Sequence, residues 1–154
     1  MSDAVRISAK AVVVLRDRIL LLKHVDADGE WYSLPGGGQE HGETLDEALV
    51  RECYEETGVD VRMGRLLFIR DYIAKNHEFA EDDGDAHQLE LMFECEVSGS
   101  ADAGLGSVPD EMQTGVAWVP LDDLRELRLY PQAVARILAG GVPDGDAAYL
   151  GDVN

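Results

Sequence analysis

The sequence predicts a single domain of mixed class, an α+β or α/β sandwich. Short apolar segments typical of strands outnumber helical ones, the two kinds are interspersed along the chain, and neither a repeat nor a linker divides it. A length of 154 residues suffices for one domain with a sizeable core. We expect the core to span about residues 5–139 and the Gly- and Asp-rich tail, about 140–154, to be loose.

The N-terminal part of the chain is expected to be β structure followed by a glycine loop. Residues 5–15 are largely β-branched and predict a strand, and the apolar run at 19–22 makes 5–24 a hairpin. A short strand at 31–34 ends at Pro35. The three glycines at 36–38 then predict a backbone loop.

The segment 44–57 predicts a well-marked helix. Thr44 followed by Glu47 is typical of a capping box, and Gly58 stands where helices commonly end. The remaining elements follow from patterning and loop composition. They are strands at 59–74 and 87–97 around an acidic loop at 76–86, a long loop at 98–113, a last strand at 116–119, and helices at 121–127 and 131–138.

The composition argues against several classes of protein and partner. Lys and Arg number 13 against 31 Asp and Glu, a net charge of −18, so neither nucleic acid nor an anionic membrane is expected as a partner. No apolar run is long enough to span a membrane, and the N-terminus lacks the apolar stretch of a signal peptide. The two cysteines form no paired motif and are expected to be reduced and buried. We therefore expect a cytoplasmic protein.

The helix 44–57 carries an unusual acidic stripe. At roughly 100° per residue, the arc that is apolar in the first two turns continues as three carboxylates, Glu52, Glu55 and Glu56. A solvated acidic face is one explanation, but the preceding apolar residues place the carboxylates at the edge of the core. Arg51 is the only nearby cation in the sequence and cannot neutralise all three. Oxygen ligands without His or Cys suit Mg²⁺ or Mn²⁺.

The residues around this helix resemble the Nudix box. The box reads Gly, five positions, Glu, seven positions, then R-E-U-x-E-E-x-G-U, where U is a bulky apolar residue. This sequence matches with Gly37, Glu43 and the run 51–59, with Cys53 in place of the usual aliphatic residue. The approach 31–37 and the later step 118–121 also resemble the family, so the likeness extends over residues 5–139.

The resemblance implies a Nudix-type α/β/α sandwich with a mixed β-sheet and an enzyme that uses Mg²⁺, or Mn²⁺. It implies attack of water on phosphorus in a diphosphate linkage of a nucleoside diphosphate derivative, such as a nucleotide, nucleotide sugar or dinucleoside polyphosphate. The partner would then be this small-molecule substrate, and a homodimer stays open because dimers are common in such families.

The resemblance also assigns roles to residues by their position in the box. The metal ligands would be the Gly36 carbonyl, Glu52, Glu55 and Glu56, and Glu52 would also orient or deprotonate the attacking water. Arg51 would hold the carboxylates in place, and Glu43 would steady Arg51 or a metal-bound water.

The general base and the substrate contacts outside the box are less well defined by the sequence. Glu111, in the loop before the strand 116–119, is one candidate base, and Glu78 and Glu81 in the acidic loop are others. The alternative for all three is a solvated loop charge. Arg70 and Lys75 are candidates to hold a phosphate, with solvated strand ends as the alternative. The aromatic residues that could stack a base, or pack in the core, are Tyr72, Phe68, Phe79 and Phe93.

The sequence does not single out one substrate or exclude a non-catalytic role. No proline occurs between Pro35 and Pro109, so the proline signature of the ADP-ribose branch is missing, and Tyr72 is too close to the box for the tyrosine of the dinucleoside-polyphosphate branch. One alternative is a catalytically silent Nudix-fold module that senses a ligand. Another is an isomerase or RNA-decapping role, and the acidic surface disfavours decapping.

Overall fold

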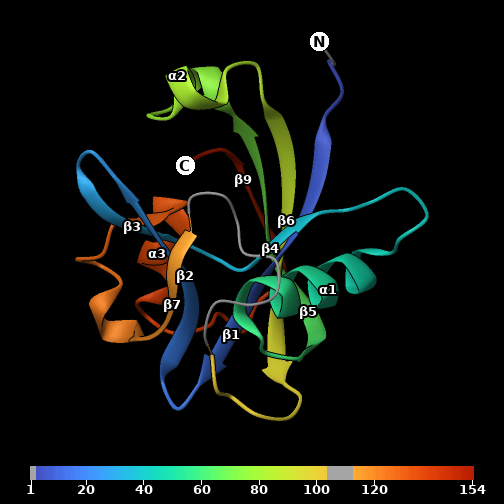
Figure 1. Ribbon diagram of the computed structural model, residues 1–154, viewed down its shortest axis with the longest axis vertical. Coiled ribbons are helices and arrows are strands. Elements are labelled where there is room, and N and C mark those ends of the chain that lie inside the picture. Colours follow the sequence, from blue (N-terminus) through green and yellow to red (C-terminus); the bar gives the residue numbers. More distant parts are fainter. Residues whose placement is uncertain (1–2, 104–112) are drawn as a thin grey trace.

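The computed structural model describes residues 3–103 and 113–154, and its main feature is a mixed β-sheet. Nine strands run in the order β8-β3-β2-β1-β6-β5-β9, with β4 paired to β1 and β7 paired to β2 (Figure 1). The strands are β1 (Arg6–Leu15), β2 (Arg18–Asp26), β3 (Gly29–Ser33), β4 (Gly36–Gly38), β5 (Val61–Ile73), β6 (His87–Val97), β7 (Gln113–Pro120), β8 (Leu129–Tyr130) and β9 (Ala148–Asp152). The helices are α1 (Leu45–Thr57), α2 (Ala80–Asp83) and α3 (Gln132–Leu138), with 3₁₀ turns η1 (Ala74–Asn76) and η2 (Leu121–Asp123). A mixed sheet with helices confirms the predicted α+β class.

Strand β1 is the branching point of this sheet. One edge of β1 pairs in parallel with β6, from Arg6 opposite Gln88 to Val13 opposite Cys95. The other edge pairs with β4 over residues 8–10 and with β2 over residues 14–15. The sheet therefore forks along β1, and the glycine strand β4 lies in the fork.

Two apolar clusters form the core, one on each side of the central strands. Alternate residues of β1 face opposite sides, so Val12 joins the cluster that contains α3 and Val13 joins the cluster that contains α1. Figure 1 shows α1 and α3 on opposite sides of the central strands. Leu49 and Cys53 anchor α1 in its cluster, and Glu56 lies buried on the same side of this helix.

Several sequence predictions are confirmed and several are wrong. The hairpin at the N-terminus, the helix 44–57, the strands at 59–74 and 87–97 and the helix at 131–138 are present. Glycines 36–38 form strand β4, not a loop, because their bare backbone fits against β1. The acidic loop contains η1 and α2, and the segment 121–127 holds only η2.

The C-terminal part of the chain also differs from the expectation. The strand predicted at 116–119 is β7, and it is followed by β8 and β9. The tail from residue 140 onward was expected to be loose, but β9 pairs in parallel with β5. Polar side chains on both strands hold this pairing, and its apolar pattern is too weak to read from the sequence.

Two further observations concern the cysteines and the helices. Cys53 and Cys95 are buried and free, as expected. Among the residues described, no helix has the length and apolar character needed to cross a membrane.

Candidate active site

Helix α1 places the acidic stripe at the edge of the core. The Thr44 side chain accepts from the backbone N–H of Glu47, the Glu47 side chain accepts in return from the backbone N–H of Thr44, and Gly58 ends the helix in the left-handed conformation. With both ends fixed, the buried stripe continues from Leu49 into Glu56, which is 1% exposed. Glu52 and Glu55 lie beside it and are partly exposed.

Strand β4 brings its backbone against two of these carboxylates. The N–H of Gly36 donates to Glu56 Oε1 at 2.8 Å. Gly36 has φ +133°, and a Cβ there would lie 2.2 Å from the carbonyl oxygen of Ala9. A Cβ on Gly37 would lie 2.6 Å from the carboxyl carbon of Glu52. Only glycine lets the strand approach β1 on one side and the carboxylates on the other.

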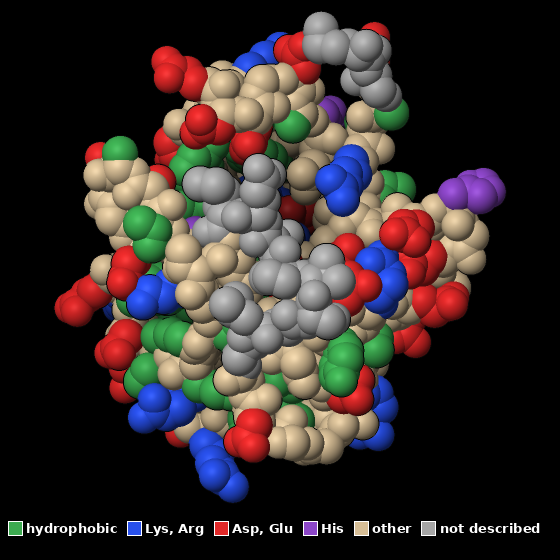
Figure 2. Space-filling model, viewed as in Figure 1, with side chains coloured by type: hydrophobic (Ala, Val, Ile, Leu, Met, Phe, Trp, Pro, Cys, Tyr) green, Lys and Arg blue, Asp and Glu red, His purple; other side chains and the backbone are tan. Residues whose placement is uncertain are grey.

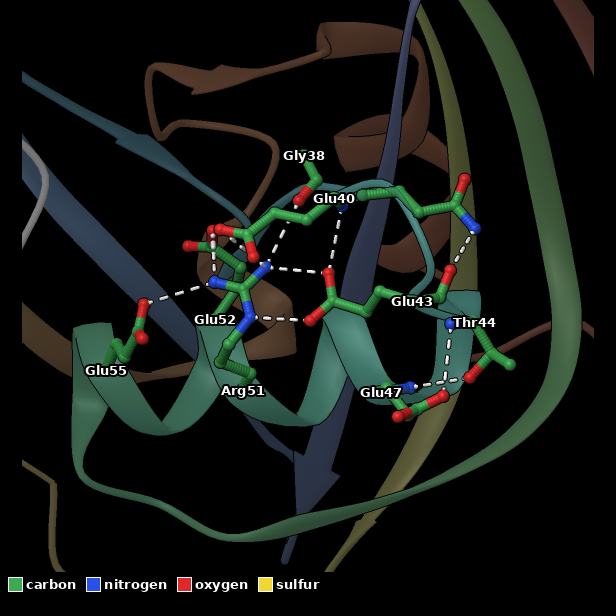
Figure 3. A network of polar contacts seen from close by, with 9 residues as sticks. Gly38, Glu40, Glu43, Thr44, Glu47, Arg51, Glu52 and Glu55 are labelled. Carbon is green, nitrogen blue, oxygen red and sulfur yellow. Dashed lines mark hydrogen bonds and ion pairs between the residues drawn. The ribbon is translucent and has the colours of Figure 1, made fainter.

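Arg51 connects the acidic side chains of α1 with the loop before it (Figure 3). Its Nε and Nη2 donate to the two oxygens of Glu43 at 2.7 and 2.9 Å, a bidentate pair. Its Nη1 donates to Glu52 at 3.0 Å and to Glu55 at 3.4 Å, and Nη2 reaches the Gly38 carbonyl at 3.3 Å. Hydrogen bonds from Arg51 lower the pKa of Glu43 to about 2, and the same contacts raise the pKa of Arg51.

These contacts bear on whether the site can hold a metal. Among the described residues, no three His, Cys, Asp or Glu side chains gather closely enough to form a metal-binding group. The donor set nevertheless suits a hard cation, because it consists of carboxylates and a backbone carbonyl. The space that a Cβ on Gly37 would fill lies directly against the Glu52 carboxylate. The residues present therefore fit Mg²⁺ or Mn²⁺ chemically, with Arg51 Nη1 now bridging Glu52 and Glu55.

A cleft of about 320 Å³ opens beside β4. Its walls come from β1, β2, β3, β5, β6, the chain around α2 and β8, and Asn154 after β9. Lys10, on its rim, donates to the Gly36 carbonyl at 3.3 Å. Since the N–H of the same glycine contacts Glu56, Gly36 joins the carboxylates to the cleft. Figure 2 shows Asp and Glu side chains gathered over α1 and the loop before it.

One wall of the cleft is aromatic. Trp31 stacks on His24 with ring centroids 4.0 Å apart and an interplanar angle of 17°. Phe79 approaches Trp31 at 5.1 Å and meets Tyr130 edge-on at 5.1 Å. His24 is fixed from behind by a 2.7 Å hydrogen bond to Ser33. The result is an aromatic surface in a cleft that is also lined by polar groups on β5 and β6.

The opposite wall contains two of the residues proposed from sequence to bind substrate. Arg70 and Tyr72 both line the cleft, and each is 6% exposed. Arg70 donates to Glu90 at 2.7 Å, so its charge is already paired. Tyr72 donates to Asp83 at 2.6 Å, and burial together with this carboxylate raises its pKa. Lys75 is exposed and does not line the cleft.

The candidate general bases outside the box lie in different places. Glu78 is exposed and accepts from Asn154 at 2.8 Å, and Glu81 is an exposed residue of α2. Glu111 lies outside the described residues. Of the aromatic candidates, Phe79 lines the cleft, whereas Phe68 and Phe93 pack in the core.

The cleft residues that sequence reasoning missed include Lys10, Trp31 as a stacking surface, and Tyr130. Lys10 had a usable signal, because it is a cation among the apolar residues in the middle of the strand predicted at 5–15. Trp31 was noted only as part of the approach to the box. Tyr130 had no such signal, since its place depends on the pairing of β8 with β3.

Known proteins resemble this chain in sequence and in fold. A MutT-like protein of Streptomyces ambofaciens is 31% identical over 121 residues, which cover 78% of this chain and 67% of that protein. The chain spans only 29–30% of the length of three other curated relatives, from Caenorhabditis elegans and Mus musculus. A solved ADP-ribose pyrophosphatase of Streptococcus suis shares the fold, with a TM-score of 0.61 at 21% identity over 97% of this chain and 100% of that one.

The family comparison covers the acidic helix and most of the cleft described above. The NUDIX domain family matches residues 5–139, a span that includes β1, the glycine strand β4 and the acidic helix α1. A match over most of the sequence, which includes the elements that carry the clustered carboxylates, shows that this chain belongs to the Nudix family.

Proposed function

We propose that this protein hydrolyses a diphosphate linkage in a nucleoside diphosphate derivative, using Mg²⁺ or Mn²⁺. The observation that carries the proposal is the position of Gly36 between two groups. Its N–H contacts the buried Glu56, and its carbonyl contacts Lys10 on the rim of the aromatic cleft. A diphosphate at this point would have the carboxylates on one side and space for an organic group on the other.

The metal would be held by the Gly36 carbonyl, Glu52, Glu55 and Glu56. When bound, it would neutralise phosphate oxygens and lower the pKa of a coordinated water. Arg51 keeps the carboxylates of α1 in position through its bidentate contact with Glu43. A bound metal ion would matter here because the protein's net charge of −18 opposes the approach of an anionic substrate.

The remaining steps are assigned to side chains of this chain. Glu52 lies against the bare Gly37 backbone and is the residue we assign to accept the proton of the attacking water. Lys10 has an ammonium group at the rim of the cleft and would contact a phosphate oxygen of the substrate. The organic group would then occupy the cleft against Trp31 and Phe79.

The alternative of a silent ligand-sensing module is weaker for a chemical reason. A module that only binds has no need for Glu43, Arg51, Glu52, Glu55 and Glu56 together, yet all are present and the first four are linked by hydrogen bonds.

A substrate panel tests the proposal. Nucleoside triphosphates, oxidised nucleotides, nucleotide sugars, ADP-ribose and dinucleoside polyphosphates should be assayed with Mg²⁺ and with Mn²⁺. We expect metal-dependent release of a phosphate-bearing product from at least one of them, abolished by EDTA. Binding of nucleotides with no turnover by either metal would favour the sensing module.

A further inference from the structure

We propose that Asp152 is a positioning residue for the substrate cleft, and that the segment 152–154 sets its selectivity for ligands that carry a planar base. This inference rests on the proposed function, because it takes the cleft to receive the nucleoside part of the substrate. It concerns residues that lie beyond the 5–139 family match.

Asp152 ties the end of β9 to the chain that leads into the cleft. Its Oδ1 accepts from the backbone N–H of Ile73 at 2.9 Å and lies 2.6 Å from His77 Nε2, while its Oδ2 accepts from Asn76 at 2.9 Å. One carboxylate therefore fixes three successive points of η1 and its flanks. Burial alone would raise the pKa of Asp152, but these hydrogen bonds outweigh it and lower the pKa to about 2.

The segment held by Asp152 leads into Phe79, which is part of the aromatic wall. His77 stacks on Tyr72 with centroids 5.7 Å apart, and the Tyr72 hydroxyl in turn contacts Asp83 of α2. Phe79 lies between these two anchors and reaches Trp31 and Tyr130. Phe79 is at the start of a helix of only four residues, so the position of its ring depends on these anchors.

The last residue of the segment reaches the opposite wall of the same cleft. Asn154 Oδ1 accepts from Arg70 Nη1 at 2.9 Å, and its amide group donates to Glu78 at 2.8 Å. Arg70 is also bound to Glu90, and all three of Arg70, Glu90 and Asn154 line the cleft. The segment 152–154 therefore contributes to both walls, placing an aromatic ring on one side and an amide on the other.

The cleft carries an aromatic surface and two carboxylates, Asp83 and Glu90, and Arg70 is already paired with Glu90. Its other cation, Lys10, lies at Gly36, where the proposed function places the diphosphate. This lining suits an uncharged planar group that can stack, and it disfavours a densely phosphorylated one. The chemistry that the segment 152–154 selects is therefore that of a nucleobase.

The test compares Asp152→Ala with a matched control, Asp146→Ala, an exposed residue for which the described structure shows no hydrogen bond or ion pair. On the best nucleotide from the panel we expect Asp152→Ala to raise KM roughly fivefold to tenfold with kcat within about twofold. Kinetics on 5-phosphoribosyl 1-diphosphate, which has no base, should be unchanged. Asp152→Asn, which keeps an acceptor oxygen, should recover part of the loss.

Two further measurements keep the outcome clear. In a Trp118→Phe background, quenching of Trp31 fluorescence by nucleotide in EDTA should show a similar loss of affinity in Asp152→Ala. The double variant with Phe79→Leu should be no worse than Phe79→Leu alone, because Asp152 acts through that ring. Equal losses on base-bearing and base-free ligands, fully additive effects, or no nucleotide binding at all would overturn the inference. If nucleotide affinity falls in Asp152→Ala but no substrate is hydrolysed, the proposed function fails while this inference stands.

Discussion

Glu56 is the most buried carboxylate of the site, and its removal gives the sharpest test of the metal assignment. Glu56→Gln keeps an oxygen to accept from the Gly36 N–H but loses the charge. We expect kcat to fall at least about 100-fold at saturating Mg²⁺, because even residues that only support a ligand contribute roughly 10- to 100-fold. The melting temperature should change little. Asp46→Asn, an exposed change on the same helix, is the control, and full turnover by Glu56→Gln would remove Glu56 from the ligand set.

The pKa of Glu43 is lowered to about 2, chiefly by its hydrogen bonds from Arg51. Glu43 therefore stays ionised in the folded protein down to about pH 2. Its ion pair with Arg51 contributes fully to stability above pH 4.5, and this contribution is lost as the pH falls from 4.5 to about 2. We expect Glu43→Gln to lower kcat by roughly 10- to 100-fold. The ratio of wild-type to variant activity should stay constant between about pH 5 and 9. A ratio that changes within that window would show that Glu43 titrates during turnover.

Among the elements of the site, strand β4 is expected to tolerate an added Cβ atom least well. Gly36→Ala would drive a Cβ to 2.2 Å from a backbone oxygen at a φ of +133°, and we expect a loss of at least about 2 kcal/mol in the free energy of unfolding. Gly37→Ala would press on the flexible Glu52 side chain instead, so activity should fall more than stability. Gly145→Ala, with nothing near its Cβ, is the control. Thermal melts and kcat should be measured on all three variants. A melting temperature of Gly36→Ala equal to that of Gly145→Ala would contradict the expected loss of stability.

Elements with local signals were predictable and those without were not. The capping box at Thr44 and the terminal Gly58 mark α1 in the sequence, and the structure has both. β4 could not be predicted because a run of glycines has no side-chain alternation, and its strand character comes only from β1. β9 has the same difficulty, since its contacts with β5 are made by polar groups such as Asp152.

The candidate site also has a part that the sequence predicts and a part that it does not. The acidic residues of α1 are close in sequence, and helical geometry brings them together, so their proximity could be predicted. The cleft joins β1, β3, β5, β6 and β8, and no local pattern specifies which of their residues meet. The stack of His24 on Trp31 illustrates this, because it requires the β2–β3 register that sets the two residues opposite each other.

For the molecule as a whole, the net charge of −18 should shape substrate capture. An anionic substrate is repelled by this field, and salt screens the repulsion. At constant free Mg²⁺ we expect KM to fall roughly threefold as NaCl rises from about 10 to about 150 mM, with kcat unchanged. A KM that rises over this range would mean that local cations such as Lys10 dominate the encounter. Initial rates at five or more salt concentrations would decide between the two.

The parallel pairing of β1 with β6 has a consequence for how the chain is made. Arg6 pairs with Gln88, so β1 is synthesised well before its central neighbour β6 exists. Pairing over such a long separation is slow, and an unpaired apolar strand invites association with other chains. While the protein is still on the ribosome, the edge of β1 that will pair with β6 is therefore open to such association and would benefit from chaperones.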